Sequence, residues 1–252
     1  MIKLSKNWEF NVLGIDNFKI QGKLTPYYDF IRENHKLIDG DICEVGVYRG
    51  FSLLATAMLL KELGSNKKVW GFDSFEGFPE YHDNDSLEKF NELYVNGIIS
   101  KKHYLDFKRN QEFKEFVLKK NVDVKNISTS GDFSKNSLKE LEEKINFLEL
   151  DNIKLIKGNF TDTMNDNFFE NKDISFFAGL IDCDLYKGYQ SSLPFIYKRL
   201  KPGSYVFLDE YYSLKFPGAR IATDEFFSLK LDKPFMHAKI SGDFERWGFI
   251  KS

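Results

Sequence analysis

The chain has 252 residues, with 36 basic and 38 acidic side chains and a net charge of −2. This length allows one large core, so we expect a single domain over residues 1–252. The balanced charge offers no broad basic surface, which excludes nucleic acid as the expected partner. No apolar run is long enough to span a membrane and the first residues lack a secretory pattern, so we expect a cytoplasmic protein.

From about residue 40 onward, short apolar runs alternate with amphipathic ones, a pattern typical of a parallel sheet covered by helices. Strands are predicted over residues 40–46, 68–73, 153–158, 176–182 and 204–210. Helices are predicted over residues 52–64, 134–150 with Ser134 as N-cap, 188–203 ending at Lys201-Pro202-Gly203, and 222–231. The last residues predict two antiparallel strands around a turn at Gly242. The expected fold class is therefore α/β, with a mostly parallel sheet and an antiparallel C-terminal hairpin.

Two segments fall outside this alternation. Residues 1–39 form an N-terminal extension with one predicted amphipathic helix, capped by Thr25 and carrying Pro26 in its first turn. Residues 78–132 are far longer than a usual connection and rich in aromatic and charged side chains. We expect this insertion to form two or three helices that serve as a lid or an oligomer contact.

The first predicted strand ends in a glycine-containing turn. In open α/β sheets, ligands bind at the carboxyl ends of the strands. Glu44, Gly46 and Gly50 lie at that end, where glycine lets the backbone approach a ligand and the next helix directs its amides toward it. The spacing is not G-x-G-x-x-G, which disfavours a dinucleotide, and a plain strand-to-helix turn explains the glycines equally well.

The second and third strands end in residues suited to a nucleoside. Asp73 could accept both hydroxyls of a ribose, or it could cap a helix. Gly158-Asn159-Phe160 could line an adenine, although an aromatic residue after a strand also suits the core.

The fourth and fifth strands end in four carboxylates: Asp182, Asp184, Asp209 and Glu210. Neighbouring strand ends lie about 5 Å apart, so these groups are expected to crowd together and raise one another's pKa. A hard divalent cation would relieve the repulsion, and oxygen ligands favour Mg²⁺, Mn²⁺ or Ca²⁺ over zinc. Alternatively, the carboxylates cap the following helices or pair with Arg220.

The cysteines and histidines suggest no site of their own. Cys43 and Cys183 fall in predicted strand ends, where they are expected to be buried free thiols. The four histidines lack the spacing of a zinc or nucleophilic site, and His237 is expected to be structural: His35, His82, His103 and His237.

Five segments together resemble the macrocin O-methyltransferase (TylF-type) family. They are "GDICEVGVYRGFSLL", "VWGFDSFEGFPE", "IKGNFTDTM", "LIDCDLYKGYQSSLPFIYKRLKPGSYVFLDEY" and "GARIATDEFF". Their order and spacing match over about residues 38–228. The resemblance implies a Rossmann-like class I methyltransferase fold that uses S-adenosylmethionine and a divalent metal, Mg²⁺ or Mn²⁺, to methylate a sugar hydroxyl.

The resemblance also implies roles for individual residues. It assigns cofactor binding to Glu44, Gly46, Tyr48, Arg49 and Ser52 at the methionine part, Asp73 at the ribose, Ser74, Gly158, Asn159 and Phe160 near the adenine, and Asp182. It assigns metal binding to Asp182, Asp209 and Glu210, and the general base to Asp184. The family usually has two aspartates where this chain has Asp209-Glu210, so either the ligand geometry adjusts or Glu210 binds through water.

The acceptor and the competing functions stay open at this level. A nucleotide-activated sugar or a surface-polysaccharide precursor is favoured because four basic residues of the insertion could meet a diphosphate, although they could also be a solvated face: Lys101, Lys102, Lys108 and Arg109. A glycosylated natural product is the other acceptor. Asp-x-Asp also suits a metal-dependent glycosyltransferase, and a non-catalytic scaffold is a further alternative. We expect a homodimer or a larger homo-oligomer.

Overall fold

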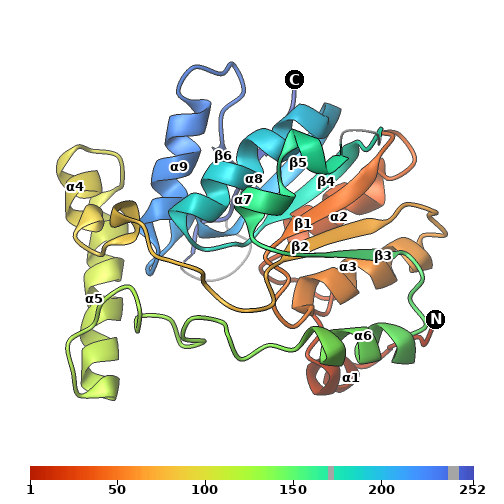
Figure 1. Cartoon of the computed structure of the whole chain (residues 1–252), viewed down its shortest axis with the longest axis horizontal. Helices are drawn as coiled ribbons and strands as arrows, with labels where there is room; N and C mark the ends of the chain where they lie inside the picture. The colour runs from red at the N-terminus through yellow and green to blue at the C-terminus, as the bar shows by residue number, and fades with distance from the viewer. Residues whose placement is uncertain (170–172, 238–243) are drawn as a thin grey trace.

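The structure, a computed structural model, describes residues 1–169, 173–237 and 244–252, and its centre is a seven-stranded sheet (Figure 1). The strand order is β3-β2-β1-β4-β5-β7-β6. Strands β1 to β5 are parallel, while β7 is antiparallel to both of its neighbours, β5 and β6. The strand bounds are β1 Asp41–Val45, β2 Val69–Asp73, β3 Ile153–Lys157, β4 Phe176–Ile181, β5 Leu200–Leu208, β6 Phe235–Met236 and β7 Trp247–Ile250. The α/β class, the parallel strands and the antiparallel C-terminal pair are confirmed, and the predicted turn at Gly242 lies outside the described residues.

Helices cover both faces of the sheet because successive strand residues point to opposite sides. Ile42 and Leu180 pack into one apolar cluster with helices α1, α2, α3 and α6. Cys43 and Ile181 pack into the other, with α8 and α9. The helix bounds are α1 Asn7–Leu13, α2 Thr25–Asn34, α3 Phe51–Glu62, α6 Leu138–Phe147, α7 Phe160–Thr163, α8 Tyr186–Arg199 and α9 Pro217–Phe227.

The N-terminal extension holds two helices, not the single one expected. Helix α1 is short and buries Phe10 alone, so its apolar periodicity is weak. Glu9 accepts the backbone N–H groups of Ser5 and Lys6 at 2.6 and 2.8 Å, and Gly14 closes the helix in a left-handed conformation. Thr25 is the first residue of α2 and not its cap.

Three predicted helices have other bounds in the structure, and in each a local reason explains one of the differences. Helix α6 begins at Leu138 because Ser137 caps it, while the Ser134 hydroxyl bonds to Asp132 at 2.6 Å. Helix α8 spans Tyr186–Arg199, so the residues expected to end it lie in β5 (Leu200–Leu208). Helix α9 begins at Pro217, earlier than expected, because proline is preorganised for the first helical turn.

The insertion forms the short turn η1 (Asp83–Asp85) and helices α4 (Lys89–Val95) and α5 (Lys101–Leu118), as the sequence predicts. A third apolar cluster joins it to the body, with Phe90 and Phe107 of the insertion packing against Leu185 and Phe216. Much of α5 projects beyond the sheet and its helices (Figure 1).

Within the described ranges, no helix combines the length and apolar character needed to cross a membrane.

Candidate active site

A cavity of about 420 Å³ opens at the carboxyl ends of β1, β2 and β4. The strand order reverses between β1 and β4, which is where ligands bind in open α/β sheets. Nine of the residues singled out in the sequence line it: Gly46, Tyr48, Ser52, Asp73, Ser74, Asn159, Phe160, Asp182 and Asp184. Five do not: Glu44, Arg49, Gly158, Asp209 and Glu210.

The turn after β1 requires glycine because two strand ends meet there. Gly46 has φ +87°, and a Cβ atom at this position would lie 1.8 Å from the carbonyl oxygen of Asp182. The Gly46 N–H donates to the Phe72 carbonyl at 3.0 Å. The backbone therefore passes closely between β2 and β4, directly beneath the cavity.

Asp73 organises the cavity floor through the backbone. Its Oδ2 accepts the N–H groups of Val47 and Tyr48, both at 2.8 Å, and its Oδ1 accepts the Phe75 N–H at 2.7 Å. The carboxylate thus braces two turns. The alternative, that Asp73 caps a helix, is wrong. A carboxylate has about four acceptor positions, so at least one stays available to a ligand.

Glu44 lies below the cavity and is linked to it by a hydrogen bond from Ser52, which lines the cavity. Its side chain is fully buried, Oε1 accepts the Ser52 hydroxyl at 2.7 Å, and Oε2 has no hydrogen-bond partner among the described residues. Burial raises the pKa of Glu44 to about 8. Ser52 is therefore the member of this pair that a ligand in the cavity can touch.

The other predicted cofactor residues have local partners. The Arg49 guanidinium does not line the cavity and donates to the Lys135 carbonyl at 2.6 Å. The Ser74 hydroxyl donates to the Gly77 carbonyl at 2.9 Å. Asn159 caps α7 by accepting the Thr161 N–H at 3.3 Å, next to Gly158 and Phe160.

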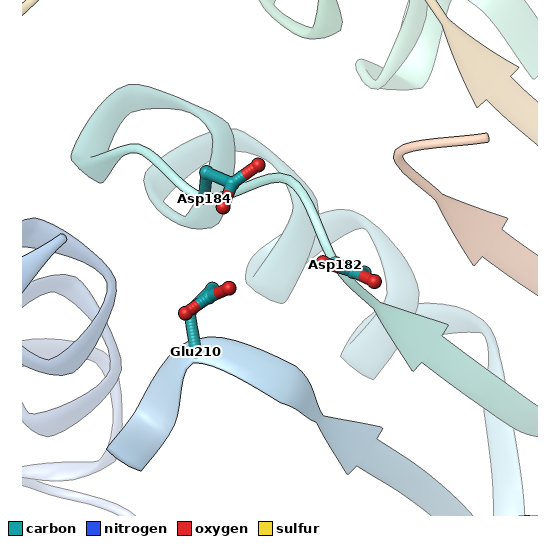
Figure 2. A group of neighbouring side chains, drawn as sticks. All are labelled: Asp182, Asp184 and Glu210. Carbon is teal, nitrogen blue, oxygen red and sulfur yellow. The ribbon is translucent and has the colours of Figure 1, made fainter. Parts of the chain in front are cut away.

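Three carboxylates lie close together, as Figure 2 shows, and two of them line the cavity. Asp182 and Asp184 follow β4, and Glu210 lies in the turn η3 (Asp209–Tyr212) after β5. One oxygen of each lies within 4.8 Å of the others. We call Asp182, Asp184 and Glu210 the acidic cluster.

Asp209 stands apart from this cluster. Its Oδ2 accepts the Lys23 ammonium at 2.5 Å, while its buried Oδ1 has no partner among the described residues. Lys23 also lies 3.9 Å from Asp182 Oδ2, and Lys215 lies 3.8 Å from Glu210 Oε1. Arg220 pairs with Asp224 at 2.7 Å and does not neutralise the cluster, so that alternative is wrong.

Burial, with a smaller contribution from neighbouring carboxylates, raises the pKa of two of these groups. Burial and then the charge of Asp209 raise the pKa of Asp182 to about 8. Burial and then the charge of Glu210 raise the pKa of Asp184 well above its usual range. Oxygen donors that repel one another, together with the unpartnered Asp209 Oδ1, fit a hard divalent cation.

A buried tyrosine fixes the distance between the two strand ends. The Tyr189 hydroxyl on α8 donates to the Ile181 carbonyl at 3.0 Å and accepts the Glu210 N–H at 3.1 Å. The hydroxyl therefore ties the end of β4 to the turn that carries Glu210.

Sequence reasoning missed Lys23, Lys215 and Tyr189 as parts of this site. Lys23 precedes α2 in the N-terminal extension, and no motif connects it with carboxylates at residues 182 and 209. Lys215 follows Asp209-Glu210 closely in the sequence, and this nearness was the one signal that could have predicted its contact with Glu210.

The two cysteines behave as expected, and two of the histidines have hydrogen-bond partners in the fold. Cys43 and Cys183 are buried and free. His103 Nε2 lies 2.6 Å from the Ser213 carbonyl, and His237 Nε2 lies 2.6 Å from the Tyr205 hydroxyl. These contacts are structural.

The comparison with protein families gives a match to the model of macrocin O-methyltransferase (TylF) over residues 29–151 and 120–246. A curated relative, the mycinamicin III 3''-O-methyltransferase of Micromonospora griseorubida, is 27% identical over 176 residues. That alignment covers 69% of this chain and 56% of the relative, so the chain matches about half of the relative's length.

Solved structures share the fold. The calicheamicin methyltransferase CalS11 superposes with a TM-score of 0.62 at 19% identity, covering 96% of this chain and 79% of that chain. The O-methyltransferase NovP gives 0.60 at 17% identity, covering 97% and 79%.

Proposed function

Because the chain belongs to the macrocin O-methyltransferase (TylF) family, we propose that it transfers the methyl group of S-adenosylmethionine to a sugar hydroxyl with the help of a divalent metal. One observation carries the proposal: the cavity at the strand-order reversal and the acidic cluster share Asp182 and Asp184. A cofactor in the cavity would therefore lie beside the carboxylates.

The cavity suits a nucleoside with an amino-acid part. Its volume of about 420 Å³ is that of a small-molecule site. Asp73 keeps an acceptor position that could take a ribose hydroxyl. Ser74, Asn159 and Phe160 line the cavity and would lie near the adenine, and Ser52 would meet the methionine part. Arg49 would act only by supporting the turn.

The acidic residues would hold the metal and move the proton. Asp182 and Glu210 would bind the metal directly, joined by Asp209 through its unpartnered Oδ1. When bound, such a cation lowers the pKa of a hydroxyl, which for an alcohol lies near that of water, about 16. Asp184, within the same cluster, would accept the proton while the sugar oxygen attacks the methyl carbon in line with the departing sulfur.

The names of similar proteins favour a sugar acceptor of one of two kinds. The curated relative is named as a methyltransferase that acts on the 3'' oxygen of mycinamicin III. A second CalS11 structure, with a TM-score of 0.52, is described as a TDP-rhamnose 3'-O-methyltransferase. Both a nucleotide-activated sugar and a glycosylated natural product are therefore acceptors to test, and the family match disfavours a glycosyltransferase.

The basic residues of α5 do not strengthen the case for a diphosphate. None of Lys101, Lys102, Lys108 and Arg109 lines the cavity. Lys102 pairs with Asp106, and Lys108 donates to Gln111 at 2.9 Å. A solvated helix face explains these four residues, and the acceptor must be identified by assay.

The test is methyl transfer from labelled S-adenosylmethionine to a panel of both acceptor kinds, read by mass spectrometry. We expect turnover with Mg²⁺ or Mn²⁺ and none in EDTA, with recovery when metal is restored. Undiminished methylation in EDTA would contradict the metal mechanism, and failure to bind S-adenosylhomocysteine in calorimetry would contradict methyl transfer itself.

Asp184→Asn tests the proposed base. Loss of a general base costs about 10²- to 10⁴-fold in turnover, while affinity for S-adenosylhomocysteine should change little. Asp166→Asn is the matched control, because Asp166 is largely exposed and its ion pairs within the described residues are with Lys198 and Arg199. Equal activity of the two variants would rule out Asp184 as the base.

A further inference from the structure

Lys23 connects the N-terminal extension to the site. It lies in the turn just before α2 and lines the cavity together with Asp182. Its ammonium is 2.5 Å from Asp209 Oδ2 and 3.9 Å from Asp182 Oδ2. The Lys23–Asp209 contact joins residues 186 positions apart.

Asp209 pairs with Lys23 and is not a member of the acidic cluster. The oxygens of Asp182, Asp184 and Glu210 gather within 4.8 Å, and Asp209 does not join them. It directs Oδ2 to Lys23 and leaves Oδ1 buried without a partner in the described part of the chain. A buried, unpartnered carboxylate oxygen is unfavourable unless a positive group meets it.

The lysine is placed so that it can withdraw. Its neighbours Leu24 and Tyr28 are buried and anchor the turn. The Lys23 side chain itself is 43% exposed, and its flexible four-carbon stem can move the ammonium into solvent without moving the backbone. Asp209, with a side chain only 6% exposed, cannot follow it.

We propose that Lys23 gates the metal site: its ammonium pairs with Asp209 Oδ2 beside Asp182 until a divalent cation, bound by the acidic cluster and Asp209 Oδ1, repels it into solvent. The ammonium and the cation carry like charge and compete for the same carboxylates, so each weakens the binding of the other. This inference rests on the metal site of the proposed function.

The test is Mn²⁺ binding to the full chain, measured by calorimetry and by the electron paramagnetic resonance of free Mn²⁺. Lys23→Met removes the charge and keeps the apolar stem, so it should bind Mn²⁺ about tenfold tighter than the wild type, within the range of ordinary coupling between sites. Lys23→Arg retains the charge and should bind much as the wild type does. Lys36→Met removes one exposed charge outside the cavity and should leave the affinity unchanged.

The outcomes separate this inference from the proposed function. If the wild type binds Mn²⁺ and Lys23→Met binds it no more tightly, the gate is overturned and the metal site stands. If neither the wild type nor Lys23→Met binds Mn²⁺ while both bind S-adenosylhomocysteine, both the metal site and the gate are contradicted. Melting curves check folding, and Lys23→Gln replaces the methionine substitution if that chain does not fold.

Discussion

At the scale of single residues, three non-glycine residues that line the cavity have the left-handed backbone conformation, which most residues avoid. Tyr48, Phe133 and Asp184 line it with φ values of 51°, 60° and 60°. Left-handed backbone costs about 1–2 kcal/mol at a non-glycine residue, and such residues gather at functional sites. Figure 2 shows the Asp184 carboxylate facing Glu210 from this position.

Gly46→Ala should damage both stability and cofactor binding. The added Cβ would lie 1.8 Å from the Asp182 carbonyl oxygen, so β1 and β4 must separate. Overpacking and left-handed strain together predict a loss of about 3 kcal/mol or more in the free energy of unfolding, measured by urea titration. Affinity for S-adenosylhomocysteine should fall with it.

Gly64→Ala is the matched control. Gly64 also has positive φ, +65°, but a Cβ there would meet nothing within 4 Å. This substitution should cost only the backbone strain, about 1 kcal/mol. Equal losses in the two variants would show that the contact with Asp182 is unimportant.

At the scale of elements, the insertion is tied to the helix that follows the Asp-x-Asp segment. Asp85 of η1 is fully buried; its Oδ1 accepts the Tyr186 N–H at 2.8 Å, and its Oδ2 accepts the His82 N–H at 2.9 Å. The insertion therefore supplies a polar partner for the first turn of α8. Since Tyr189 on the same helix holds Glu210, this contact bears on the site geometry.

Asp85→Ala should destabilise the protein by about 2 kcal/mol, because it leaves the buried Tyr186 N–H without its acceptor. Urea unfolding measures the loss, and methyl transfer should weaken in parallel. The exposed Asp83 in the same turn gives the control, since Asp83→Ala should stay within about 0.5 kcal/mol of the wild type. If both variants match the wild type, the insertion is not anchored through Asp85.

At the scale of the whole molecule, buried carboxylates make stability depend on pH. Burial raises the pKa of Glu44 to about 8 from an ordinary value of 4.5. Between these values the folded chain holds a proton that the unfolded chain has lost. The contribution of this proton to stability is complete below the lower value and disappears as the pH rises through the upper one.

Glu44→Gln should flatten this dependence. From about pH 5 to about pH 8, the free energy of unfolding of the wild type should fall relative to the variant by up to about 1.4 kcal/mol per pH unit. Urea titrations across this range measure the difference, and Glu142→Gln, at an exposed position, should run parallel to the wild type. Parallel curves for Glu44→Gln would mean that Glu44 is ionised when folded.

The strands and the residues at their carboxyl ends were predictable from the sequence. Apolar runs with acidic or glycine ends are local signals, and they predict strands β1 to β5. The known spacing of neighbouring strands then predicts that Asp182 and Asp184 lie close to Glu210. Helix starts were less certain because several nearby residues can serve as the N-cap. Ser134 and Ser137 were both candidates for α6, and Ser137 is the cap.

The sequence by itself determined which residues end the strands, because strand patterning and turn chemistry act over a few residues. The tertiary structure alone decided which charges meet. It separated Asp209 from its neighbour Glu210 and paired it with Lys23, across 186 positions of the chain. Such a contact depends on how α2 packs against the sheet, and no local pattern encodes it.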